Sequence, residues 1–261
     1  MKWCRFQVGN KVAFGMVGGD EVIEVSGSPF ETYQATKTRH PLSRVKLLIP
    51  CVPPTFYAAG VNYRAHVQWA ATVGLAGSPN PPTKADIGYR ANNALIAHEE
   101  NIVVPKDSSG VVEYEGELVA VIGKKAKHLS REEALGCVLG YTIGNDLSER
   151  SWQKQDRTLW RAKNTDTFKP MGPWIVTGLD PNNIDMTIKL NGKVVSQFNT
   201  GKMVFDVAHY ISTMSRYLTL YPGDVIWTGT DNATGPMRPG DVVEVEASHI
   251  GVLRNRVVAE Q

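Results

Sequence analysis

Residues 111–123 alternate their side chains in the manner of a β-strand. Successive side chains of a strand point to opposite faces, so Glu113, Glu115 and Glu117 share one face. Three carboxylates at that spacing repel one another, and each must either raise its pKa or find a cation. A divalent cation is one solution, and an acidic edge strand exposed to water is the other. The strand pattern alone favours the exposed edge.

Short strands also dominate the N-terminal region. Two turns, Gly9-Asn10 and Gly18-Gly19-Asp20, separate alternating segments as in β-hairpins. Prolines at positions 50, 53 and 54 then break any regular element. We therefore expect a small N-terminal β domain over residues 1–52 and a main domain over residues 53–261. The predicted N-terminal strands are 2–8, 11–17 and 21–25.

The main domain predicts more strands than helices. Asn191-Gly192 is the strongest short hairpin signal, and the segment from Ser130 to Glu133 is a capping box that opens a short helix. Residues 74–84 form a loop rich in glycine and proline, as in lids and binding loops. No regular alternation of strands and helices is visible, so we expect a mixed β-rich (α+β) roll or sandwich instead of a doubly wound sheet. The predicted strands are 56–61, 138–143, 184–190, 193–198, 224–228, 242–246 and 252–258, and the longer predicted helices are 67–73 and 204–218.

Composition narrows the possible partners. The chain has 261 residues, 42% of them hydrophobic, which suffices for a sizeable core. Its net charge of +2 comes from interspersed signs, so nothing indicates nucleic acid or an anionic membrane. Cys4, Cys51 and Cys137 lie far apart and suit neither a disulfide framework nor a zinc site. Without a long apolar run, we expect a soluble, cytoplasmic protein that binds a small molecule.

Five motifs follow one another through the main domain. They are NYRAH at 62–66, EYEGEL at 113–118, GYTIGNDLSERSWQ at 140–153, RAKNTDTFKPMGPW at 161–174 and GDVIWTGT at 223–230. In this order they resemble the fumarylacetoacetate hydrolase family. The resemblance covers residues 53–261 and implies the family's β-sandwich roll, often preceded by a small N-terminal β domain. It also implies a homodimer.

The resemblance implies a metal site. Glu115 and Glu117 match two ligands of a divalent ion, and Asp146, just past a predicted strand, matches the third. The ion in the family is generally Mg²⁺, and Mn²⁺ or Ca²⁺ can substitute. Three hard oxygen ligands leave positions open for water and substrate. Glu113 would then support the ligands, unless it is a solvated surface residue.

Other matched positions imply a substrate that is a 2-oxo acid or a diketone. Lys163 matches the lysine that stabilises an enolate oxygen beside the metal. Gln153 and Thr230 match groups that hydrogen-bond the carboxylate or keto group of the substrate. Arg150 and Asp166 could orient these side chains or form a structural ion pair. The predicted substrate-binding residues are Tyr63, Arg150, Gln153 and Thr230.

His66 matches the histidine at the start of a lid helix, which acts as an acid or base or positions the attacking water. Here the chain departs from the pattern. Relatives that hydrolyse carbon–carbon bonds typically have Glu three residues later, whereas this chain has Trp69, and Ala65 stands where Asp is common. A tryptophan cannot orient an imidazole as a carboxylate does, so water activation needs another group. The candidates are Asp86, Glu99 and Glu100.

Two further departures concern the substrate pocket. Residues 231–235 read DNATG where relatives commonly have Pro-Ala-Gly-Val, and Asn164-Thr165 follow Lys163 where Ser-Phe is usual. Both departures lie beside residues that the resemblance places at the substrate. They favour a substrate unlike that of the best-known members.

The resemblance implies enolate chemistry. We rank two such reactions and one non-catalytic alternative. First is hydrolysis of a carbon–carbon bond in an acylpyruvate-like or β-diketo acid, because this reaction is widespread in the family. Second is an isomerase, tautomerase or decarboxylase of a 2-oxo or 2-hydroxy-diene dicarboxylate from aromatic catabolism, and Trp69 favours it. The third is a non-catalytic module that only binds a metal or a small acid. Lys163, Gln153 and Thr230 weigh against that third reading.

Overall fold

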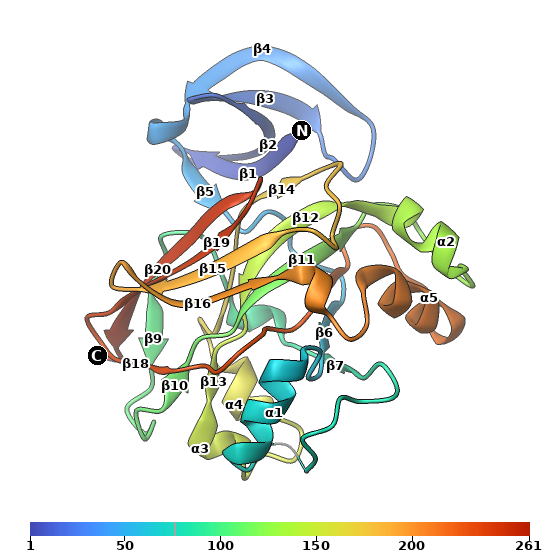
Figure 1. The fold of residues 1–261 in the computed structure, drawn as a ribbon. Helices are drawn as coiled ribbons and strands as arrows, with labels where there is room; N and C mark the ends of the chain where they lie inside the picture. Colours follow the sequence, from blue (N-terminus) through green and yellow to red (C-terminus); the bar gives the residue numbers. More distant parts are fainter. Residues whose placement is uncertain (76) are drawn as a thin grey trace.

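The acidic segment lies in the middle of the largest sheet. In the computed structural model, which describes residues 1–75 and 77–261, this sheet has the strand order β4-β3-β2-β1-β14-β12-β11-β17-β6-β7, with β5 paired to β1 and β8 to β14 (Figure 1). Only the pairs β17–β6 and β8–β14 in this sheet are parallel among the described residues. The strands are β1 (Lys2–Val8), β2 (Lys11–Gly18), β3 (Glu21–Gly27), β4 (Tyr33–Pro41), β5 (Lys46–Leu48), β6 (Phe56–Ala59), β7 (Ile87–Tyr89), β8 (Leu95–Ile96), β11 (Gly116–Ile122), β12 (Val138–Asn145), β14 (Lys169–Val176) and β17 (Val225–Trp227).

Two smaller sheets complete the architecture. A five-stranded sheet of order β16-β15-β19-β20-β9 packs against β11, β12 and β14, and a three-stranded sheet has the order β13-β10-β18. The strands are β9 (Ile102–Val104), β10 (Val112–Glu113), β13 (Ser148–Glu149), β15 (Asp185–Leu190), β16 (Lys193–Asn199), β18 (Pro236–Met237), β19 (Val242–Ala247) and β20 (Gly251–Ala259). The predicted hairpin at Asn191-Gly192 joins β15 and β16, and Asn191 has the left-handed φ of 52° that such a turn requires.

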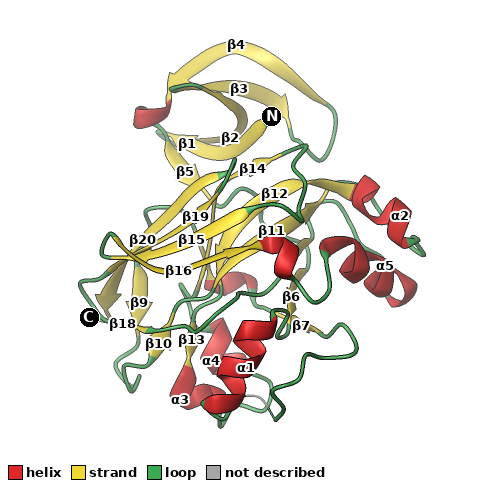
Figure 2. Cartoon of the chain, in the orientation of Figure 1, coloured by secondary structure: helices red, strands yellow, loops and turns green. Residues whose placement is uncertain are grey.

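The α-helices lie at the margins of the sheets (Figure 2). The capping box at Ser130 and Glu133 is present, with both reciprocal hydrogen bonds. The side chain of Asp206 caps the longest helix by accepting from the backbone N–H of His209. The helices are α1 (Arg64–Thr72), α2 (Arg131–Ala134), α3 (Arg150–Gln153), α4 (Trp160–Asn164) and α5 (Val207–Tyr217). No helix in the described part of the chain is long and apolar enough to cross a membrane.

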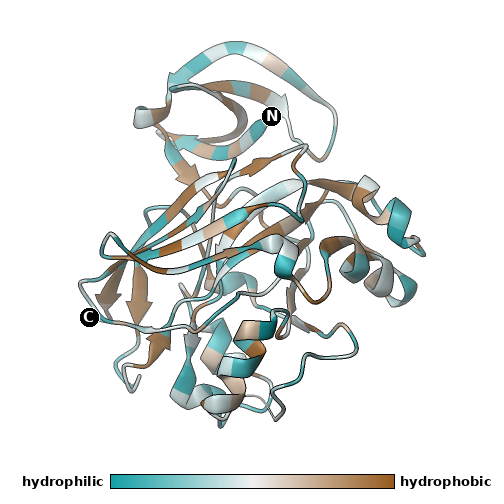
Figure 3. Cartoon of the chain, in the orientation of Figure 1, coloured by the Kyte–Doolittle hydropathy of each residue, from teal (hydrophilic) through white to brown (hydrophobic). Residues whose placement is uncertain are grey.

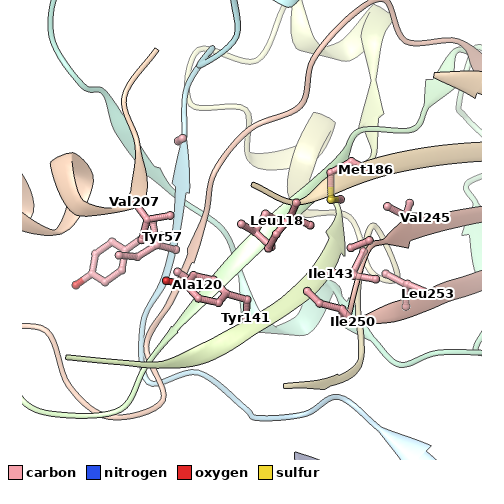
Figure 4. Close-up of a cluster of buried hydrophobic side chains, with 14 of the residues drawn as sticks. Tyr57, Leu118, Ala120, Tyr141, Ile143, Met186, Val207, Val245, Ile250 and Leu253 are labelled. Carbon is pink, nitrogen blue, oxygen red and sulfur yellow. The ribbon is translucent and has the colours of Figure 1, made fainter. Parts of the chain in front are cut away.

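The main core fills the space between the large sheet and the five-stranded sheet. Leu118 of β11 and Ile143 of β12 meet Met186, Val245 and Leu253 of the second sheet (Figure 4). The opposite face of β11 packs into a second cluster that reaches Trp3 in the N-terminal strands. Because both faces of β11 are covered, all seven of its residues are buried. The β-rich mixed fold predicted from the sequence is confirmed.

The acidic segment is not one continuous strand, which corrects the prediction for residues 111–123. It divides into β10 and β11, which belong to different sheets. At the break, the N–H of Glu115 donates to Asn145 Oδ1 at 2.9 Å, and the carbonyl of Glu115 accepts from the N–H of Asp146 at 2.8 Å. A side chain at Gly116 would lie 2.8 Å from Val245, so only glycine allows the chain to enter β11 here. The break places the carboxylates where the pocket forms.

Several strands escaped prediction, and β4 and β14 are the longest of them. Strand β4 is mostly polar and mostly exposed, so it lacks the alternation that marks a half-buried strand (Figure 3). Strand β14 lies in the middle of the sheet, but its sequence contains Pro170 and Pro173. Proline is typical of strands at the edge of a sheet, so this sequence did not indicate a central strand. Both strands depend on pairing with partners that the local sequence does not reveal.

The N-terminal strands join the rest of the molecule through β1 and β14. Lys2 pairs with Val176 and Trp3 with Ile175, so the large sheet runs through both regions (Figure 1). The division into residues 1–52 and 53–261 therefore stays a prediction. The predicted loop at 74–84 includes Ala76, which lies outside the described residues, and the other residues of that loop form neither helix nor strand.

Candidate active site

Three carboxylates meet at one end of β11 and β12. Glu115 directly precedes β11, Glu117 is its second residue, and Asp146 directly follows β12, whose Asn145 pairs with Gly116. Each carboxylate offers one oxygen, and these oxygens lie within 4.8 Å of one another. All three side chains are buried, with 5%, 2% and 1% of their residue surfaces exposed. The antiparallel pairing of β11 with β12 thus brings together residues that are separate in the sequence.

Buried cations surround Asp146. Lys163 Nζ bridges Glu115 Oε2 at 2.6 Å and Asp146 Oδ2 at 2.8 Å. Arg90 donates to both oxygens of Asp146, at 3.2 and 2.9 Å, and Lys169 Nζ lies 2.8 Å from Oδ1. Burial alone would raise the pKa of Asp146, but these cations hold it well below its usual range. Burial also lowers the pKa of Lys169 to about 7, although Asp146 opposes that change.

Arg150 forms hydrogen bonds with two neighbouring carboxylates and with two other polar side chains at the pocket. Its Nε donates to Glu113 at 2.8 Å, and its Nη2 donates to Glu115 at 2.6 Å. Its Nη1 donates to Gln153 Oε1 at 2.8 Å, and Nη2 also donates to Thr234 at 2.9 Å. Burial opposes a low pKa of Glu115, but Lys163 and Arg150 outweigh it and lower that pKa. Arg150 thus contacts Gln153, and its role in orienting that side chain toward a substrate stays a prediction.

Glu117 differs from the other two carboxylates because no cation contacts it among the described residues. Its Oε2 accepts one hydrogen bond, from the N–H of Gly229 at 2.8 Å. Burial, with Asp146 and Glu115 nearby, raises the pKa of Glu117 well above its ordinary value. An added cation among the three carboxylates would reverse that effect. The donor set is all hard oxygen, so these residues fit a divalent ion such as Mg²⁺ or Mn²⁺.

His66 lies near the start of α1 and close to the carboxylate cluster. Its Nδ1 lies 2.8 Å from the backbone oxygen of Asn232, and its Nε2 lies 3.7 Å from Glu115 Oε1. A carbonyl can only accept, so we assign the ring proton to Nδ1 and a lone pair to Nε2. Trp69, one turn later, lies against the ring with a centroid distance of 5.1 Å. Burial lowers the pKa of His66.

The remaining predicted residues divide into two groups. Gln153 and Thr230 line the pocket, and the buried hydroxyl of Thr230 has no hydrogen-bond partner in the described part of the chain. Tyr63 does not line it: this side chain is fully buried and packs against Phe198 at 5.2 Å. The structure therefore gathers the predicted metal and catalytic residues, together with three of the four predicted substrate-binding residues, on one pocket. That pocket has a volume of about 170 Å³.

Several candidates lie elsewhere. Asp166 accepts from Asn93 and lines a different cavity, so it does not orient the substrate groups. Asp86, Glu99 and Glu100, proposed as replacements for the missing lid carboxylate, are not on the pocket wall. Glu99 pairs with Arg254 and Glu100 with Lys46, whereas the backbone of Asp86 accepts from Gly60. None of the three is a recorded partner of His66.

Sequence reasoning missed two buried cations, Arg90 and Lys169. Arg90 follows the edge strand β7, and Lys169 begins the proline-containing strand β14. A lone arginine or lysine is usually exposed, and no spacing links either residue to Asp146. Only the lysine between Phe168 and Pro170, in a segment without other charges, offered a weak signal. Leu159, which lines the pocket, was also missed, and so was the contact of the Asn232 backbone oxygen with His66.

Comparison with known proteins identifies the family. The sequence profile described as "Fumarylacetoacetate (FAA) hydrolase C-terminal" matches residues 55–258, and "Rv2993c-like, N-terminal" matches residues 1–50. The chain belongs to the fumarylacetoacetate hydrolase family. The resemblance stated from the five motifs is thus confirmed.

Solved structures and curated relatives of this family include different enzymes. A 5-carboxymethyl-2-hydroxymuconate delta-isomerase from Mycobacterium smegmatis is 37% identical with a TM-score of 0.90, and the match covers 100% of both chains. The mitochondrial oxaloacetate tautomerase Fahd2a of Rattus norvegicus is 34% identical over 84% of this chain and 71% of its own length. Maleylpyruvate hydrolase from Sphingobium sp. SYK-6, in complex with manganese(II) and pyruvate, is 28% identical with a TM-score of 0.81 over 100% of both chains. The chain is accordingly an enzyme of the fumarylacetoacetate hydrolase family, which weighs against a purely binding module.

Proposed function

We propose that this enzyme is a divalent-metal-dependent isomerase that interconverts the keto and enol forms of a 2-oxo acid. The hydrogen bonding of His66 carries the proposal. Because Nδ1 donates to the carbonyl of Asn232, Nε2 faces Glu115 with its lone pair free. Burial lowers the pKa of His66, so this lone pair is available near neutral pH. A single base of this kind can remove a proton from carbon and return it.

The cluster of Glu115, Glu117 and Asp146 would hold the ion, for which we propose Mg²⁺, with Mn²⁺ or Ca²⁺ as substitutes. When bound, the ion would act as an electron sink for the 2-oxo group of the substrate. Lys163 would lie beside the same carboxylates and donate to the enolate oxygen as negative charge develops there. Since its Nζ now bridges two of the three carboxylates, it must turn toward the substrate when the ion binds.

Two further residues would hold the substrate carboxylate. The Oε1 of Gln153 accepts from Arg150, which leaves its amide N–H groups free to donate. The hydroxyl of Thr230 is buried on the pocket wall and has no partner among the described residues. A carboxylate bound by these donors would satisfy the otherwise costly buried hydroxyl.

The surroundings of His66 favour proton transfer over hydrolysis. Hydrolysis requires the base to activate water, which is a weak acid. A carboxylate on Nδ1 would stabilise the imidazolium and strengthen His66 as a base. Here Nδ1 meets a neutral carbonyl, and Trp69 occupies the sequence position at which relatives that hydrolyse carbon–carbon bonds typically have Glu. His66 thus lacks the carboxylate that favours water activation, so we place enolisation first.

Hydrolysis of a carbon–carbon bond, ranked first from the sequence, is the second candidate. The whole-chain likeness to a maleylpyruvate hydrolase favours it. The same carboxylate cluster and Lys163 would serve either reaction, because both pass through an enolate. Decarboxylation of a 2-oxo dicarboxylate is a third outcome of the same intermediate.

The two reactions are distinguished by their products. Purified protein with Mg²⁺ is incubated with acetylpyruvate and with oxaloacetate, while the enol absorbance band and released pyruvate are followed together. We expect the enol band of oxaloacetate to relax faster than in the uncatalysed control, without matching pyruvate. His66→Gln should slow this relaxation by about 100-fold or more, because the general base is lost. Release of one pyruvate for each acetylpyruvate consumed would establish hydrolysis instead.

The assembly and location expected from the sequence belong to this proposal as well. We propose a homodimer and a cytoplasmic enzyme. Sedimentation equilibrium tests the first, and a mass of about 29 kDa, close to the 28.7 kDa of one chain, would contradict it.

A further inference from the structure

The pocket is lined by a charged group of side chains and by an apolar group. The carboxylate cluster and its cations are the charged floor. The apolar wall consists of Val61, Trp69, Ala70, Leu75 and Leu159, which line the same cavity. A cavity of about 150 Å³ suffices for benzene, and this one measures about 170 Å³. The pocket therefore has room for an apolar group of about the size of a benzene ring.

Among the described residues, every cation on the pocket wall already has a carboxylate partner. The cations that line the pocket are Arg90, Arg150 and Lys163, and each already pairs with carboxylates of the floor. Arg150 also donates to Gln153 and Thr234, so four of its hydrogen bonds are in use. In the described part of the chain, no further lysine or arginine lines the pocket. A carboxylate placed against the apolar wall would lose water without gaining a partner.

Two contacts hold the Trp69 ring on the pocket wall. Its ring lies between His66, at 5.1 Å from centroid to centroid, and the guanidinium of Arg150, at 5.4 Å from the ring centroid. The contact with Arg150 is a cation–π interaction, so the Trp69 ring covers part of that guanidinium. Trp69 is half-buried, so part of the ring is available to a ligand.

Leu159 is held in the same pocket by an unusual backbone. Its φ is 57°, in the left-handed region that branched side chains rarely adopt. Its carbonyl nevertheless accepts from the N–H of Lys163 at 3.1 Å and from Asn164 Nδ2 at 3.0 Å. A glycine or asparagine would fit this conformation more easily. The strained position therefore carries an apolar side chain on the pocket wall where a smaller or polar one would cost less.

We infer that Trp69, Leu75 and Leu159 form a specificity subsite for an apolar, unsaturated or aromatic tail on the substrate. The enzyme then prefers a 2-oxo acid with such a tail to a 2-oxo dicarboxylate. The planar enol of an aryl-substituted 2-oxo acid would lie against the Trp69 ring with its carboxylate on the charged floor. This inference rests on the proposed enolisation and adds the chemistry of the tail.

Deuterium exchange at C3 tests both statements. Pyruvate, phenylpyruvate and oxaloacetate are each incubated with the Mg²⁺-loaded protein in D₂O, and loss of the C3 proton signal is followed by NMR with subtraction of the uncatalysed rate. We expect kcat/KM for phenylpyruvate to exceed that for oxaloacetate by about tenfold or more. If pyruvate and both larger acids fail to exchange, the proposed function is wrong. If pyruvate exchanges but oxaloacetate is preferred to phenylpyruvate, only the tail subsite is wrong.

Single substitutions test whether Trp69 and Leu75 belong to the subsite. Trp69→Ala should lower the phenylpyruvate-to-pyruvate ratio of kcat/KM by about tenfold, mainly through KM, whereas Trp69→Phe should keep most of it. Leu75→Ala, in a segment without helix or strand, is a second test that does not depend on α1 and should lower the ratio in the same direction. Tyr217→Ala removes an aromatic side chain that is 79% exposed on α5 and serves as the matched control. An equal loss for both substrates in Trp69→Ala and Leu75→Ala would show a structural role and overturn the subsite.

Discussion

Glu24 in the N-terminal strands and Asp146 at the pocket floor are both buried carboxylates with basic partners, but their partners differ. Glu24 accepts from Lys11 at 2.6 Å and lies 3.2 Å from His40, and the side chain of Lys11 is 66% exposed. Asp146 meets Arg90, Lys163 and Lys169, whose side chains are at most 8% exposed. The first group can exchange its partner for water, and the second cannot.

This difference separates a modest stabilising contact from a site prepared for chemistry. An ion pair with an exposed lysine gains little, because water competes for both charges. In a buried cluster, the cost of removing the charges from water opposes the attraction between them. Removing one member therefore leaves the other charges buried without a partner. The pocket also keeps Glu117 without a cation, which costs stability in the free protein and creates affinity for an added ion. Loss of the carboxylate charge should therefore destabilise the protein far more at Asp146 than at Glu24, whereas at Glu117 it should not destabilise the free protein.

The largest effect on stability is expected for Asp146→Asn. The change leaves Arg90, Lys163 and Lys169 buried with less opposing charge, and we expect a loss of about 3–5 kcal/mol in the free energy of unfolding. Urea unfolding at pH 7 in the presence of EDTA measures it. Asp20→Asn, at an exposed turn, is the matched control and should change little. A loss below about 1 kcal/mol in Asp146→Asn would mean that the cations reach water, and the comparison would fail.

Glu117→Gln should change the stability of the metal-free protein with the opposite sign from Asp146→Asn, or leave it unchanged. The raised pKa of Glu117 means that its neutral form suits the free protein, so the neutral amide should leave the metal-free melting temperature unchanged or higher. The same variant should lose about 100-fold or more in Mg²⁺ affinity, and activity should fall with it. Thermal unfolding with and without Mg²⁺ reports both effects. Glu113→Gln, which removes a charge paired with Arg150, is the contrast and should destabilise the protein. Equal destabilisation by the two variants would show that Glu117 is a paired carboxylate after all.

Local signals in the sequence predicted much of the fold. The Asn-Gly turn predicted the β15–β16 hairpin, and the Ser130–Glu133 pattern predicted the start of α2, because both signals act within a few residues. Strands β4 and β14 were missed, since their stability comes from pairing across the sheet. The same limit explains the break before Gly116, which depends on Val245 and Ile188 from the opposite sheet.

The site was predictable where motifs fix the backbone and less so elsewhere. The positions of Glu115, Glu117 and Asp146 follow from two neighbouring strands, so the sequence could place them together. Arg90 and Lys169 reach Asp146 from distant strands, and nothing in their spacing indicates that contact. The missing lid carboxylate was noticed from Trp69, but the backbone carbonyl that binds His66 could not be, because any residue at position 232 supplies one.

The smallest effect is expected in the N-terminal strands, from Glu24→Gln. The hydrogen bond from Lys11 lowers the pKa of Glu24 below its unfolded value of about 4.3, so its ionised form stabilises the fold. That contribution is complete above the unfolded pKa and is lost as the pH falls through the lower folded pKa. Wild type should therefore exceed Glu24→Gln by less than about 1 kcal/mol at pH 7, and the difference should shrink toward zero in acid. Urea unfolding of both proteins between neutral and acidic pH measures it, and added salt should reduce the difference because Lys11 is exposed. A difference as large as that of Asp146→Asn, or one that persists in acid, would show that exposure of the partner is not what separates the two regions.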